Sequence, residues 1–206
     1  MDYLLRGIFI GLMFGIPVGA VGVLTVQRTL RYGVKAGLFT GLGSSAADCF
    51  YACVGAFGFT LVSDFLLARQ NIINIAGGML ILFMGSRLLL CKAEGGKEKT
   101  EMAGTAKMFL SSFAVGITNP AAILTFLFAF SYFGISAGAG MVRGSFLVCG
   151  VLIGTYIWWG TITAAAWFAQ KKSGSFDFQK MNRIFGAILC LFGMAVFLRQ
   201  ILSGTN

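Results

Sequence analysis

One carboxylate, Asp48, lies inside the small and apolar stretch GLGSSAADCFYACVGAFG, residues 41–58. An acid in apolar surroundings is costly, which makes a functional role the leading hypothesis. Ser44, four residues before it, and Tyr51, three residues after it, share its helical face. Such a group can bind a cation, carry a proton or do each in turn. The alternative is a neutral acid that hydrogen-bonds to a neighbouring helix.

Two prolines, the only two in the chain, mark a second kind of candidate site. Pro17 lies between Gly15 and Gly19, and Pro120 follows Asn119 in GITNPAAILTF. Proline removes an N–H and crowds the carbonyl four residues back, so each is a candidate helix break. A helix that restarts after a break presents free N–H groups that suit a carboxylate. A tolerated proline kink is the alternative at Pro120.

Thr155 and Trp158, in the stretch GTYIWWG, are the third candidate group. Aromatic rings inside an apolar segment can line a substrate cavity or stack over an ammonium group. Ordinary packing against helices or lipid is an equally good interpretation for a single Trp. Packing is also the preferred role of Gly7 and Gly11, because small residues at this spacing let another helix approach closely.

The elements that must position these residues are membrane spans. The chain of 206 residues is 57% hydrophobic and only 11% charged, against about 25% charged in soluble domains. Apolar runs near the roughly 20 residues that a spanning helix needs recur along it. We predict an all-α integral membrane protein with six transmembrane helices, at about 4–26, 36–62, 71–91, 106–133, 142–169 and 182–202. The first run is too long for the apolar part of a signal peptide.

The two halves of the chain resemble each other. NIAGGMLILFMGSRLL begins at Asn74 in the third run, and NRIFGAILCLFGMAVF begins at Asn182 in the sixth. Their Asn, Gly and Gly residues match at one constant offset, and the first and fourth runs each contain one proline. Two consecutive three-helix halves must have opposite orientations. We therefore predict two inverted three-helix repeats, with helices 1 and 4 broken near proline.

We therefore predict a single transmembrane transporter domain, 1–206, with halves at about 1–91 and 106–206. The polar linker at about 92–105 is expected on the cytoplasmic side. On this arrangement twelve of the 16 Lys and Arg residues lie on one side of the membrane. The positive-inside rule makes that side cytoplasmic, so both termini are predicted outside a cytoplasmic (inner) membrane. The basic residues, Arg28 among them, are interpreted mainly as orientation signals, and the net charge of +9 is not taken as a sign of nucleic-acid binding.

These motifs resemble those of the LysE/RhtB-type amino-acid exporters, and the resemblance covers essentially the whole chain. Its most specific part is IPVGAVGVLTVQRTLRYGVKAGLFTGLGSSAADCFYACVGAFG, 16–58. Within it, 17–20 is similar to the family's Pro-x-Gly-Pro break, 28–33 to its Arg-Thr-Leu-Arg-x-Gly turn and 43–48 to its Gly-x-x-x-x-Asp helix. The fourth run resembles the family's Asn-Pro signature, and GVLIGTYIWWG resembles its Gly-rich fifth span. Ala20 departs from the pattern, since the family usually has a second proline there.

The resemblance implies export of an amino acid or a similar small metabolite, driven by the proton-motive force. The predicted partners are the amino-acid substrate, protons and the lipid bilayer, with a homo-oligomer left open and no nucleic acid. We expect no enzymatic activity, no cofactor and no metal. Two alternatives remain, a membrane thiol-disulfide electron-transfer protein of related architecture and a metal-ion exporter. The five Cys residues lie away from both prolines, which disfavours the first, and the absence of His disfavours the second.

Overall fold

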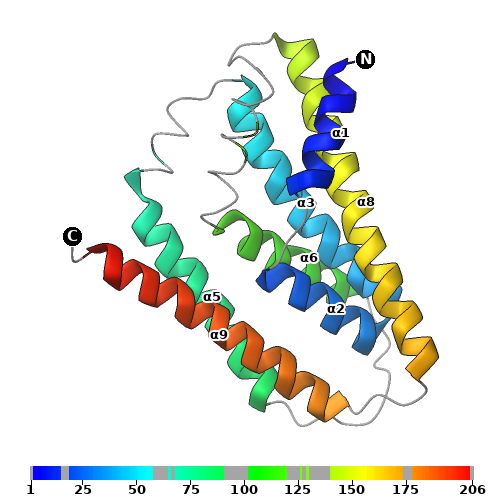
Figure 1. Ribbon diagram of the computed structural model, residues 1–206, viewed down its shortest axis with the longest axis vertical. Helices are drawn as coiled ribbons and strands as arrows, with labels where there is room; N and C mark the ends of the chain where they lie inside the picture. Colours follow the sequence, from blue (N-terminus) through cyan, green and yellow to red (C-terminus); the bar gives the residue numbers. More distant parts are fainter. Residues whose placement is uncertain are drawn as a thin grey trace.

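The computed structural model describes residues 2–14, 19–57, 65, 68–90, 102–119, 126, 129, 140–173 and 178–204. Over these residues the chain is helical, with no strand among them. Seven helices are described: α1 (Asp2–Phe14), α2 (Ala20–Tyr32), α3 (Val34–Phe57), α5 (Gln70–Leu90), α6 (Met102–Ile117), α8 (Met141–Ser173) and α9 (Phe178–Gly204). Helix α1 runs beside α8, and α5 runs beside α9. The shorter helices α2 and α6 lie between these pairs, together with α3 (Figure 1).

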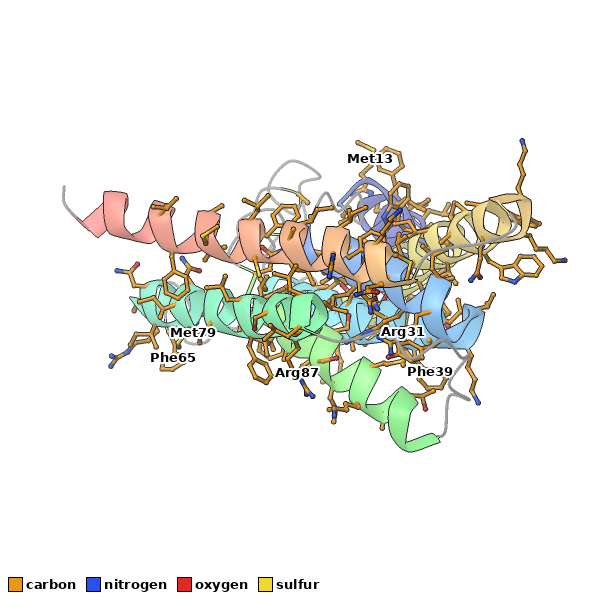
Figure 2. All side chains as sticks on the ribbon, turned by 90° about the horizontal axis from the view of Figure 1, so that it is seen from below. Met13, Arg31, Phe39, Phe65, Met79 and Arg87 are labelled. Carbon is orange, nitrogen blue, oxygen red and sulfur yellow. The ribbon has the colours of Figure 1, made fainter. Side chains whose placement is uncertain are left out.

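The helices carry their apolar surface outward, as a bilayer solvent requires. Three segments are long and apolar enough to cross a membrane, Asn71–Leu90, Met141–Lys172 and Gln179–Leu198. Large side chains such as Met13, Met79 and Leu191 are exposed, and the first two extend away from the ribbon in Figure 2. The interior is instead rich in hydroxyl and amide groups, at Thr25, Gln27, Thr29, Thr40, Ser44, Ser45, Ser112, Thr155, Thr163 and Asn182. This distribution supports the prediction of a helical membrane protein.

Small residues bring α1 against α8. A Cβ at Gly7 would lie 2.9 Å from the Cα of Gly150, and a Cβ at Gly11 would lie 2.6 Å from the carbonyl oxygen of Val151. The contact is reciprocal, because a Cβ at Gly154 would lie 3.0 Å from the Cα of Gly11. Without side chains at these positions the two backbones touch, which gives close van der Waals packing in lipid. The predicted packing role of Gly7 and Gly11 is confirmed.

Helices α5 and α9 meet in the same way. A Cβ at Gly85 would lie 3.0 Å from the carbonyl oxygen of Gly186, and one at Gly186 would lie 2.9 Å from that of Gly85. About two turns further along the pair, a Cβ at Gly193 would lie 3.2 Å from the carbonyl oxygen of Gly78. The glycines that match between the two halves of the sequence therefore form the contact between α5 and α9.

The first predicted run is divided between two helices. Helix α1 ends at Phe14, and α2 begins at Ala20 after Gly19, whose backbone is extended with φ −157° and ψ −178°. At the other candidate break, α6 ends at Ile117 and the backbone N–H of Asn119 donates to the Gly116 carbonyl at 3.1 Å. Gly15, Pro17 and Pro120 lie outside the described residues, so the breaks at the two prolines stay predictions.

Candidate functional site

The candidate site is built on one face of α3. Thr40, Ser44 and Asp48 follow one another at four-residue intervals, which places them on the same side of the helix. Thr40 and Ser44 are buried and Asp48 is half-buried. At 1.5 Å of rise per residue, this polar face extends over about 12 Å from Thr40 to Asp48. Tyr51, three residues beyond Asp48, is buried and continues it.

Helix α6 closes one side of this polar face. A Cβ at Gly43 would lie 3.0 Å from the carbonyl carbon of Phe109, and one at Gly116 would lie 2.9 Å from the Cβ of Ala47. Where the helices come this close, the Tyr51 hydroxyl donates a hydrogen bond to the carbonyl oxygen of Ile117. The sequence prediction that Ser44, Asp48 and Tyr51 share a face holds, and that face leads to the end of α6.

Helix α8 lies on the adjacent side of α3. A Cβ at Gly41 would lie 2.9 Å from the Cγ of Trp159, and the Cys49 thiol is 4.0 Å from the carbonyl oxygen of Val148. On a helix, position 48 falls between the positions that contact α6 and those that contact α8. Within the described residues the Asp48 carboxylate has no hydrogen bond and no ion pair. This half-buried acid is therefore available to a ligand or a proton.

The start of α2 lies next to the end of α6. Ala20, in the first turn of α2, packs in one cluster with Val115 and Trp159, while Gly116 lies against Ser44 and Ala47 of α3. Gly19 caps α2 without a side-chain hydrogen bond, and a Cβ on Gly19 would meet nothing within 4 Å. Gly19 has no side chain, so the capping residue itself offers no side-chain acceptor to the first N–H groups of α2.

The residues predicted from the fifth run divide between two places. Thr155 is buried at the contact with α1, and its hydroxyl donates to its own helix, to the Val151 carbonyl at 3.0 Å. Trp158 is partly buried in the cluster that contains Ala20. The indole N–H groups of Trp158 and Trp159 are buried and find no acceptor in the described part of the chain. Asn119 is exposed at the end of α6.

A buried cation, Arg28, is mainly an orientation signal in the sequence interpretation. Its guanidinium is 9% exposed and donates to the Thr40 hydroxyl at 3.1 Å, to the Met108 carbonyl at 2.9 Å and to the Ser111 hydroxyl at 2.7 Å. It joins α2 to α3 and α6. The four-residue spacing from Asp48 back to Ser44 and Thr40 is the sequence signal that could have included Thr40, the partner of Arg28, in the candidate site.

Comparison with known proteins agrees with this architecture. The chain is 26% identical over 204 residues to the uncharacterized membrane protein YahN of Escherichia coli (strain K12), covering 93% of this chain and 86% of the relative. It is 26% identical over 214 residues to the uncharacterized membrane protein YrhP of Bacillus subtilis (strain 168), covering 94% and 98%. No solved structure matches the chain.

A family model decides the assignment. The model described as LysE type translocator matches residues 12–200, which include α2 to α8 and nearly all of α9. Members of this family are membrane transporters, which fits the apolar exterior and the polar interior of the helices described above. The chain therefore belongs to the LysE type translocator family.

Proposed function

We propose that the protein is a secondary exporter that moves an amino acid or a related small metabolite across the cytoplasmic membrane, with protons as the coupling ion. The observation that carries this proposal is the Asp48 carboxylate on the polar face of α3. It is half-buried, flanked by Ser44 and Tyr51, and has no hydrogen bond or ion pair within the described residues. Intramembrane acids of this kind mark ion and proton pathways.

The proposed mechanism is competition at Asp48. The ammonium group of the substrate binds the ionised carboxylate, and a proton on the same carboxylate releases it. Because one group cannot hold both, movement of the substrate is exchanged for movement of a proton. The substrate carboxylate would lie toward the start of α2 at Gly19, where backbone N–H groups lack a side-chain cap. The buried indole N–H of Trp158, which has no acceptor within the described residues, is a further donor that could bind the substrate carboxylate.

For the fold we propose six spans in two inverted three-helix repeats, within a single domain. The support comes from the glycines of α5 and α9. The repeat equates Gly78 with Gly186 and Gly85 with Gly193, and the observed contacts join Gly78 to Gly193 and Gly85 to Gly186. A pseudo-twofold axis between the halves would exchange these two contacts.

The first span would then consist of α1 and α2, with the break between them near Pro17, and the fourth would begin with α6 and break near Pro120. Counting of Lys and Arg supports an orientation in which the loop after α2 faces the cytoplasm and both termini face outward.

Efflux from reconstituted vesicles tests the function. Proteoliposomes are loaded with the twenty standard L-amino acids, a proton gradient is imposed, and release is followed for the wild type, Asp48→Asn and Asp2→Asn. Asp2 is exposed at the start of α1 and provides the same substitution at an unrelated carboxylate. We expect proton-driven release of at least one amino acid by the wild type and by Asp2→Asn, and its loss in Asp48→Asn. Undiminished, pH-dependent release by Asp48→Asn would refute the role of this residue.

A variant without cysteine separates the exporter from the thiol-based alternative. The five Cys residues are replaced by Ala or Ser in the same assay. Efflux that continues at the wild-type rate is expected for an exporter, whereas its loss in a folded variant would favour thiol chemistry.

A further inference from the structure

Arg28 is a buried cation surrounded by neutral acceptors. The guanidinium is protonated at any physiological pH, and its three hydrogen bonds go to two hydroxyl groups and one backbone carbonyl. Within the described residues it meets no carboxylate, because the two acids in that part of the chain are Asp2 and Asp48 and neither forms an ion pair with it. A buried charge is costly unless it is paired with an opposite charge. The Arg28 guanidinium can therefore still gain free energy by binding an anion.

The position of Arg28 connects it to Asp48. Thr40 accepts a hydrogen bond from Arg28, and the same face of α3 continues through Ser44 to Asp48. The cation therefore lies at one end of the polar face and the free carboxylate lies about 12 Å further along it. A zwitterion that enters at the Arg28 end would meet a partner for its carboxylate first and a partner for its ammonium later.

The chemistry of the three acceptors favours their replacement by a substrate carboxylate at the guanidinium. A planar guanidinium binds a carboxylate through two parallel hydrogen bonds, and these charge-assisted bonds are roughly twice as strong as neutral ones. The hydroxyl groups of Thr40 and Ser111 keep their own donated hydrogen bonds when the guanidinium leaves. Thr40 donates to the Ala36 carbonyl at 2.8 Å, and Ser111 donates to the Met108 carbonyl at 3.1 Å. The exchange therefore breaks only the bonds that Arg28 itself donates, and a carboxylate replaces these with charge-assisted ones.

We propose that Arg28 is the residue that first docks the carboxylate of the exported amino acid, at the entrance to the polar face that leads to Asp48. This inference deepens the proposed function and rests on it. It assigns a substrate-recognition role to a residue whose charge would otherwise serve only to orient the helix and to hold α2 against α3 and α6. It also predicts selectivity for substrates that carry a free carboxylate.

The test compares an acid with its amide. The amino acid released fastest by the wild type, among the twenty standard L-amino acids, is measured beside its carboxamide in proteoliposomes made with Arg28→Lys, Arg28→Gln and Arg87→Lys. Arg87 is the matched control, since its side chain is exposed at the end of α5 over the ring of Phe83.

We expect the wild type to prefer the acid over the amide. Arg28→Lys should raise the KM of the acid about tenfold, the effect of losing one charge-assisted hydrogen bond, with a smaller change in Vmax. Arg28→Gln should abolish the preference, and Arg87→Lys should behave as the wild type. An unchanged KM in a folded Arg28→Lys protein, or equal transport of acid and amide by the wild type, would overturn the proposal. Release of no amino acid by the wild type would instead overturn the proposed function.

Ser111→Ala keeps the proposal falsifiable if the Arg28 variants do not fold. This variant removes one neutral competitor for the guanidinium and leaves the cation in place. If Arg28 docks the substrate, the KM of the acid should fall, because the guanidinium is held less tightly by the protein. If Arg28 only ties the helices together, Ser111→Ala should lower the unfolding temperature and leave the KM unchanged.

Discussion

Two glycines on the same helix should respond in opposite ways to alanine. A Cβ at Gly154 of α8 would collide with the carbonyl oxygen of Ile8 and would lie 3.0 Å from both the Cα of Gly11 and the backbone N of Leu12. A Cβ at Gly160, less than two turns further along α8, would meet nothing within 4 Å. Because the atoms facing Gly154 belong to the backbone of α1, no side chain can rotate to make room.

The loss of stability in Gly154→Ala can be estimated from this geometry. Carbon atoms pack at about 3.5–4.0 Å, so α1 and α8 must separate by about 0.5–1 Å around the new methyl group of Gly154→Ala, which forfeits a quarter to a half of each affected contact. Overpacking of this kind costs about 1–3 kcal/mol. Both variants gain the same helix propensity from replacing Gly by Ala. The difference in stability between Gly154→Ala and Gly160→Ala should therefore equal the overpacking cost alone.

Reversible unfolding in mixed detergent micelles, with sodium dodecyl sulfate as the denaturant, measures this difference. We expect Gly160→Ala to match or exceed the stability of the wild type and Gly154→Ala to be about 1–3 kcal/mol less stable than Gly160→Ala. Stabilities that agree within about 0.5 kcal/mol would show that α1 and α8 do not pack through these glycines, and the arrangement of α1 on α8 would be refuted.

The same unfolding assay checks three further changes. Gly33→Ala should cost about 1–3 kcal/mol, because Gly33 joins α2 to α3 at φ +92° and ψ 179°, a conformation open essentially to glycine alone; a cost near zero would contradict that backbone. Tyr51→Phe should cost about 1 kcal/mol, since the ring stays and only the hydrogen bond to the Ile117 carbonyl is lost; wild-type stability would argue against that bond. Gln27→Leu should cost about 0.6 kcal/mol, the average for an interhelical hydrogen bond in a membrane, because the Gln27 amide donates to Asn182 at 3.2 Å. A double-mutant cycle with Asn182→Leu should return the same energy as the coupling between the two residues, and a coupling of zero would exclude the bond.

Much of the fold is encoded in local patterns. Helix type and rough position follow from hydropathy, because a bilayer forces each spanning segment to satisfy its own backbone. The glycine spacing at Gly7 and Gly11 predicted close packing without identifying α8 as the partner. The shared face of Ser44, Asp48 and Tyr51 follows from helical periodicity alone.

Other features could not be predicted because they depend on residues far apart in the chain. Arg28 is an ordinary flanking cation by its position in the sequence, and only the approach of α6 gives it Met108 and Ser111 as partners. The sequence also does not show that Thr155 lies against α1 or that its hydroxyl donates to its own helix.

The sequence by itself determined that this protein is a helical membrane protein with an acid, Asp48, on a polar helix face, because solvent and periodicity act on each segment separately. The tertiary structure alone decided which helices close around that face and that the buried Arg28 lies at its other end. The physical reason is that each pair of helices packs through small residues that lie tens to more than a hundred residues apart in the sequence. No local sequence pattern contains information about that fit.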